Sequence, residues 1–129
     1  MKIASLFAAL VVAVSPIAAP STALAHTKVV ASSPADGSTV ASARVVSLSF
    51  SEALLPPTAS ASIVMTAMPG MKNHGEMAIR NFSTAWSNGN KTMVLTLAKP
   101  LPKGTYEVRW QAAGADGHRM KGTVAFTIS

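Results

Sequence analysis

Four methionines and one histidine occur at every third position within a thirteen-residue stretch: Met65, Met68, Met71, His74 and Met77. A thioether is a soft, uncharged donor without a proton to lose, so it binds Cu(I) well and remains a ligand in acid. One imidazole among several thioethers therefore predicts a Cu(I) site of low coordination number. Methionines also fill gaps in hydrophobic cores, and for Met65, in the strand expected over residues 61–66, this alternative stays open.

Most of this stretch is expected to be a loop, over residues 68–76, because Pro69, Gly70 and Gly75 are unfavourable in both helices and strands. Loops carry a large share of the functional residues of proteins. No core is expected there for the two loop methionines to fill, which favours metal binding. A methionine-rich surface for a protein partner would explain the methionines but not the histidine at the same spacing.

The first residues have the form of a secretory signal: Lys2, an apolar run over residues 3–14 that only Ser5 interrupts, and the small-x-small sequence Ala-Leu-Ala that ends at residue 25. The run is shorter than the roughly 20 residues that a membrane-spanning helix needs. We therefore expect residues 1–25 to be cleaved. The remaining domain, residues 26–129, is expected to be exported without spanning the membrane.

Cleavage at this point would make His26 the first residue, so its α-amino group and imidazole could chelate one metal ion. Asp116 and His118 are two residues apart, and in an extended segment they would project to the same face. Two imidazoles, an amine and a carboxylate suit tetragonal Cu(II). Taken alone, the pair is better explained by a turn aspartate and an exposed histidine, and His26 by a frayed terminus. The metal interpretation depends on the distribution of the three histidines, which all fall in these two sets.

The composition excludes several other classes of protein. The chain has no cysteine, so an exported domain must be stable without disulfides, and any soft metal site must use methionine. Its net charge is +6, but the lysines and arginines are scattered and the aromatic residues are few. The chain therefore lacks the basic stripe and the stacking surface of a nucleic-acid-binding protein.

Hydrophobic residues follow a period of two, which predicts strands with one face on a core and one in water. The clearest alternation covers residues 45–50, 92–97, 105–110 and 123–128. Turn-forming sequences separate such segments at residues 34–37, 56–57, 88–90 and 100–104. Without helical segments between them, these strands predict an all-β antiparallel sandwich of about seven strands.

Taken together, these motifs resemble the CopC family of periplasmic copper-binding proteins over essentially the whole mature chain. The similar segments are His26, 33–38 (Ser-Pro-Ala-Asp-Gly-Ser), 50–52 (Phe-Ser-Glu), 65–71 (Met-Thr-Ala-Met-Pro-Gly-Met), 103–106 (Lys-Gly-Thr-Tyr), Trp110 and 116–118 (Asp-Gly-His). The resemblance implies a cupredoxin-like or immunoglobulin-like Greek-key barrel with two copper sites at opposite ends. It implies a Cu(I) site in the methionine loop and a Cu(II) site at His26, Asp116 and His118, with Glu52 as an axial or outer-sphere neighbour.

The family is associated with copper resistance and with the transfer of copper to an inner-membrane permease of the CopD type. We accordingly expect a copper carrier or buffer in the periplasm, and not an enzyme. One alternative is a copper oxygenase with a histidine chelate, although Asp116 as a ligand would fill a position that oxygen activation needs. Another is a metal-free sandwich that binds protein partners.

Overall fold

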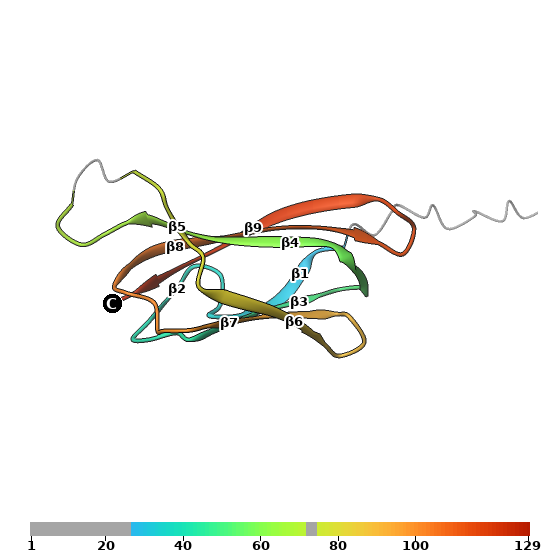
Figure 1. The fold of residues 1–129 in the computed structure, drawn as a ribbon, viewed down its shortest axis with the longest axis horizontal. Helices are drawn as coiled ribbons and strands as arrows, with labels where there is room; N and C mark the ends of the chain where they lie inside the picture. Colours follow the sequence, from blue (N-terminus) through green and yellow to red (C-terminus); the bar gives the residue numbers. More distant parts are fainter. Residues whose placement is uncertain (1–26, 72–74) are drawn as a thin grey trace, which may run out of the picture.

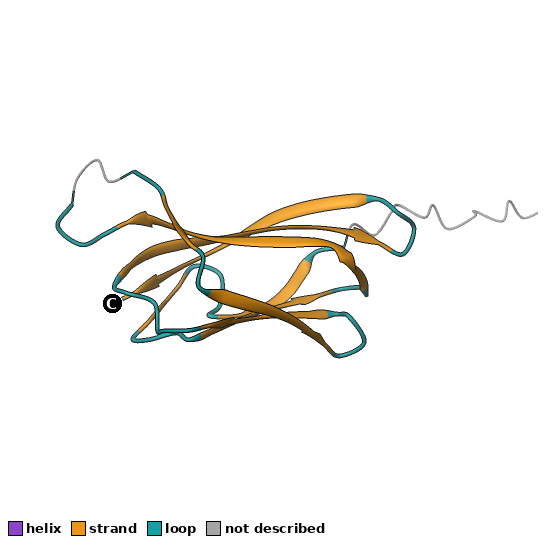
Figure 2. Ribbon diagram, viewed as in Figure 1, coloured by secondary structure: helices purple, strands orange, loops and turns teal. Residues whose placement is uncertain are grey.

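The computed structural model describes residues 27–71 and 75–129, which form two β-sheets packed face to face (Figures 1 and 2). One sheet has the strand order β1-β3-β7-β6 and the other the order β2-β9-β8-β4-β5. The strands are β1 (Val29–Ser33), β2 (Ser38–Val40), β3 (Val45–Phe50), β4 (Leu54–Ala67), β5 (Met77–Ile79), β6 (Phe82–Ser87), β7 (Thr92–Leu97), β8 (Gly104–Gly114) and β9 (Arg119–Ile128).

The expected all-β sandwich is confirmed, with nine strands in the described residues in place of about seven. The two strands β2 and β5 have three residues each, too short to produce a recognisable periodic pattern. Several neighbours within a sheet are distant in sequence, such as β3 and β7 or β4 and β8, as in Greek-key sandwiches. The described residues include no helix that is long and apolar enough to cross a membrane.

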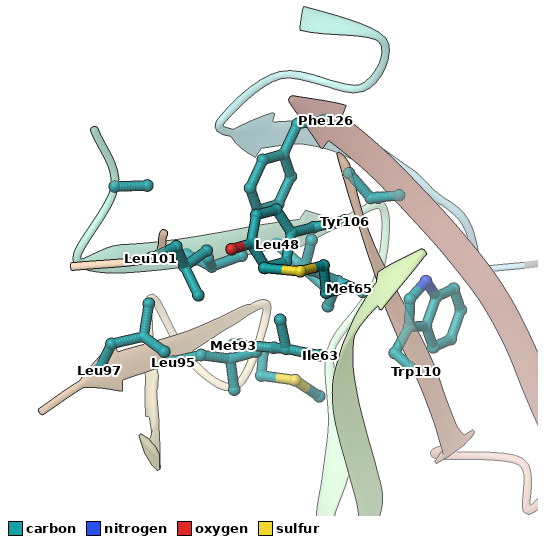
Figure 3. Packing of buried hydrophobic residues seen from close by; sticks show 14 of the residues in the cluster. Leu48, Ile63, Met65, Met93, Leu95, Leu97, Leu101, Tyr106, Trp110 and Phe126 are labelled. Atoms are coloured by element: carbon teal, nitrogen blue, oxygen red, sulfur yellow. The ribbon is translucent and has the colours of Figure 1, made fainter. Parts of the chain in front are cut away.

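The core lies between the sheets and is formed by the positions that the period of two selects. In β8, Tyr106, Val108 and Trp110 are buried, whereas the intervening residues are half-buried on the outer face. Figure 3 shows this core from close by, with Met65 among Leu48, Tyr106 and other buried side chains. The sequence pattern therefore correctly assigned the inner face of the main strands.

The turn expected at Pro56-Pro57 is wrong, because both prolines lie inside the long strand β4. Proline has no N–H to donate, so the ladder between β4 and β8 is interrupted between Leu55 and Ser60. The hydroxyl of Thr58 compensates there, since it accepts a hydrogen bond from the Ala113 N–H at 2.9 Å and donates to the Leu55 carbonyl at 2.6 Å. The prolines thus interrupt the ladder without ending the strand.

The central strand β8 defines the two ends of the sandwich. Its first residues pair with the end of β4, at Thr105 and Ala67, and its last residue pairs with the beginning of β4, at Gly114 and Leu54. We call the first of these the methionine end, because β4 continues there into Met68, and the second the hairpin end, because β8 turns there into β9 (Figure 1). The 11 residues of β8 separate the ends by roughly 33 Å at a rise of about 3.3 Å per residue.

Tyr106 fastens the start of β8 to the loop before it. Its ring is fully buried, and its hydroxyl donates a hydrogen bond to the carbonyl of Pro102, four residues upstream. Burial raises the pKa of this phenol above its usual range, so the hydroxyl keeps the proton that it donates.

We expect Tyr106→Phe to lower the free energy of unfolding by about 0.5–1.5 kcal/mol, because it removes the hydrogen bond that joins the start of β8 to the preceding loop. Urea unfolding followed by fluorescence measures the change. An unfolding midpoint equal to that of the wild type would mean that the hydrogen bond does not stabilise the fold.

Candidate metal centres

The methionine end carries a tight turn with a methionine on each side. The Met71 N–H donates to the Met68 carbonyl at 3.2 Å, and the two residues form an isolated antiparallel bridge. Pro69 and Gly70 occupy the two central positions, and Gly70 has a φ of +76°, which favours glycine at the third position of a type II turn. The turn therefore fixes the backbones of both methionines close together at the tip of β4.

The methionines of this region differ in exposure. Met65 is 2% exposed and belongs to the hydrophobic core, where its side chain lies against Gly104. Met77 is 46% exposed, although it pairs directly with Met65 in the ladder between β4 and β5. Met71 is 53% exposed, and Met68 is half-buried against the core. Met65 thus has the surroundings of a packing residue, whereas Met71 and Met77 are exposed and Met68 is only partly covered.

The hairpin end carries Asp116 and His118 in the loop that joins β8 to β9. Gly114 donates its N–H to the His118 carbonyl at 3.1 Å, and Gly117 donates its N–H to the Gly114 carbonyl at 2.9 Å. Gly117 has a φ of +83°, as expected at the end of a three-residue hairpin loop. The segment was expected to be extended, with both side chains on one face, but it is a turn. The turn, and not an extended backbone, brings the Asp116 and His118 side chains together.

Asp116 itself holds His118 in place. Its Oδ1 accepts the His118 backbone N–H at 3.0 Å, and its Oδ2 lies 2.8 Å from Nδ1 of the His118 ring. The hydrogen bond from the ring, followed by that from the backbone, lowers the pKa of the Asp116 carboxyl. An ionised carboxylate only accepts, so Nδ1 carries a proton; in the neutral imidazole, Nε2 then has a lone pair that could bind a metal ion. The two Asp116 oxygens keep further lone pairs, so the carboxylate could bind a metal ion directly without giving up these contacts.

The chain enters the fold beside this loop. Thr27 and Asp116 both lie beside Gly114. A Cβ atom at position 114 would be 3.3 Å from Asp116 Oδ1 and 4.0 Å from Thr27 Oγ1. Lys28 is fastened nearby, because its N–H donates to Ser51 Oγ at 3.2 Å and its carbonyl accepts the Ser51 N–H at 2.9 Å. Glu52, which follows Ser51, is exposed at the same end.

Two predicted ligands, His26 and His74, lie outside the described residues. In the described part of the chain, no three His, Cys, Asp or Glu side chains form a group that could hold a metal ion. The assignment of ligands to either site stays a prediction.

An ion cluster beside the methionine end was missed by the sequence reasoning. Arg109 lies 3.0 Å and 2.6 Å from the two carboxylate oxygens of Glu76, and its Nε lies 3.0 Å from Glu107 Oε2. The hydrogen bonds that Arg109 donates to Glu76 lower the pKa of the Glu76 carboxyl and are the first cause of the raised pKa of Arg109. The spacing of Glu107 and Arg109 on one strand face was visible in the sequence, but nothing in the sequence connects them to Glu76.

The fold and the two donor sets define the class as a small β-sandwich with soft donors at one end and hard donors at the other. Residues 29–129 match the CopC domain. The chain is 46% identical over 108 residues to copper resistance protein C of Pseudomonas syringae pv. tomato, which covers 82% of each chain. It is 38% identical over 118 residues to copper resistance protein C of Xanthomonas campestris pv. juglandis, which covers 92% of this chain and 91% of the relative.

A solved structure agrees with these relatives. The crystal structure of PcoC, a methionine-rich copper resistance protein from Escherichia coli, matches 81% of this chain and 100% of its own with a TM-score of 0.72 and 35% identity. The chain belongs to the CopC family. This membership agrees with the expectation that the protein is a copper resistance protein and is not an enzyme.

Proposed function

We propose that this protein carries copper in the periplasm and holds Cu(I) at its methionine end and Cu(II) at its hairpin end. Removal of residues 1–25 would complete the hairpin end by providing the amine of His26. The proposed Cu(II) ligands are His26, Asp116 and His118, with Glu52 as a neighbour, and the proposed Cu(I) ligands are Met68, Met71, His74 and Met77. Met65 is omitted, since its thioether is enclosed by the core. An inner-membrane permease of the CopD type is the proposed recipient or source of the copper.

The segregation of donor types is the observation that carries this proposal. Accessible thioethers gather at one end of β8, whereas a carboxylate and an imidazole with a free Nε2 gather at the other. Thioethers favour Cu(I), and nitrogen and oxygen donors favour Cu(II). A sandwich with this arrangement can bind either oxidation state without sharing ligands between the two.

For the Cu(I) site, we expect Met68→Leu/Met71→Leu to weaken Cu(I) binding by at least about tenfold, because it deletes two thioethers while conserving apolar volume. Competition with a chromophoric Cu(I) chelator under anaerobic conditions measures the affinity. Met65→Leu is the matched control, since it makes the same change at a buried position, and its affinity should stay within about twofold of the wild type.

Cu(II) affinity should be unchanged in both variants. Full Cu(I) affinity in the double variant would exclude the turn methionines as ligands. A loss confined to Met65→Leu would instead mean that the buried methionine is a ligand.

For the Cu(II) site, we expect one extra residue ahead of His26 to weaken Cu(II) binding severely while every side chain remains. The extension converts an amine, whose pKa is near 7.7–8.0, into an amide without useful basicity. Mass spectrometry verifies that the reference protein begins at His26, and a competition titration with EPR spectroscopy measures affinity and ligand set.

His118→Ala should have a similar effect, because it removes the free Nε2. Cu(I) affinity should survive both changes. An extended protein with the same Cu(II) affinity and EPR spectrum as the processed protein would refute the terminal chelate.

A further inference from the structure

Arg109 is held from two sides on the outer face of β8. Its guanidinium binds both oxygens of Glu76 and also one oxygen of Glu107, which lies two residues earlier on the same strand. A planar guanidinium and a carboxylate that share two parallel hydrogen bonds form a directional contact that a lysine cannot reproduce. The contact with Glu107 thus helps to orient the guanidinium of Arg109 toward Glu76.

This ion cluster borders a buried residue on the outer face of the sheet. Val64 is 7% exposed, yet it is not part of the core between the sheets. Its ladder partners are Glu107 on β8 and Ala78 on β5, and directly paired residues point to the same face. Val64 therefore lies on the outer face beside Glu107 and one ladder pair away along that face from Arg109, and the apolar stems of such long side chains can cover it.

Glu76 immediately precedes β5, the strand that carries Met77. This edge strand has three residues and pairs only with β4, through three residue pairs, in the described part of the sheet. Such short edge elements open readily. The contact with Arg109 adds a fourth attachment, at the point where the methionine loop rejoins the sheet.

We propose that Arg109 is a positioning residue for the Cu(I) site, because it binds Glu76 and thereby fixes the returning limb of the loop that presents Met77. The inference rests on the proposed Cu(I) function of the methionine end. A limb already in place loses less conformational freedom when Met77 binds copper, so the clamp increases Cu(I) affinity without contributing a ligand.

The test variant is Arg109→Met, which removes the charge but keeps an unbranched stem over Val64. We expect Cu(I) affinity to fall about 3- to 10-fold and Cu(II) affinity to stay within about twofold. In the metal-free protein, the amides of residues 77–79 should exchange hydrogen faster. Lys121→Met is the control, because Lys121 is an exposed cation on β9 and takes part in no ion pair among the residues that the structure describes. Arg109→Lys should recover only part of the loss.

Salt distinguishes positioning from a general structural effect. The Debye length falls from about 10 Å at 0.1 M to about 3 Å at 1 M ionic strength, so salt weakens an exposed ion pair. Sodium sulfate, which lacks the Cu(I) affinity of chloride, should lower wild-type Cu(I) affinity toward that of Arg109→Met and leave the variant nearly unchanged.

Three results would each overturn the positioning role. The Cu(I) affinity of Arg109→Met could equal that of the wild type, or Lys121→Met could lose as much Cu(I) affinity as Arg109→Met. The third is that salt lowers the Cu(I) affinity of the wild type and of Arg109→Met equally. A wild-type protein that takes up no Cu(I) would contradict the proposed function itself. In that case hydrogen exchange in the metal-free variants still decides whether Arg109 fixes the limb.

Discussion

The register of β8 is the constraint on which the structure depends. This strand pairs with β9 over ten consecutive positions and with β4 from Leu54 to Ala67, so it connects both ends of the domain. A slip by one residue would turn Tyr106 and Trp110 out of the core and bring Glu107 and Arg109 into it. The buried aromatic residues thereby determine where the hairpin loop turns and where β4 releases the methionines. Packing in the middle of the sandwich positions the proposed ligands at its ends.

The same strand explains how two copper sites could operate independently. Over roughly 33 Å, the repulsion between a Cu(I) and a Cu(II) ion in water is about 0.3 kcal/mol before screening by salt. This is below thermal energy, so occupation of one end does not oppose occupation of the other. The two ends also differ in the conditions that they tolerate. Thioethers bind without releasing protons, whereas imidazoles and the terminal amine must be deprotonated. As pH falls, the proposed hairpin site is therefore expected to lose copper first, while the methionine end keeps its thioether ligands even when His74 is protonated.

The sequence predicted the class of fold and the inner faces of the main strands, because a period of two reports directly on burial. It did not locate β1 or β6, nor β2 and β5, which are too short to show a period, and it mistook Pro56-Pro57 for a turn. That error arose because the strand continues past the prolines, where the Thr58 hydroxyl links β4 to β8 by accepting the Ala113 N–H. The two candidate sites followed from residue types, but burial of Met65 and the contact between Asp116 and His118 depend on the register and the hairpin. The pairing of Glu76 with Arg109 joins residues 33 positions apart, which no local pattern reveals.

The central claim is that one chain holds two copper ions in two chemically different sites at once. The most direct measurement is X-ray absorption spectroscopy of processed protein supplied anaerobically with one equivalent each of Cu(I) and Cu(II). The account predicts two bound coppers per chain, a Cu(I) ion surrounded mainly by sulfur and a Cu(II) ion with only nitrogen and oxygen neighbours, and each spectrum equal to that of the singly loaded protein. A single bound copper per chain, or sulfur in the Cu(II) coordination sphere, would contradict it.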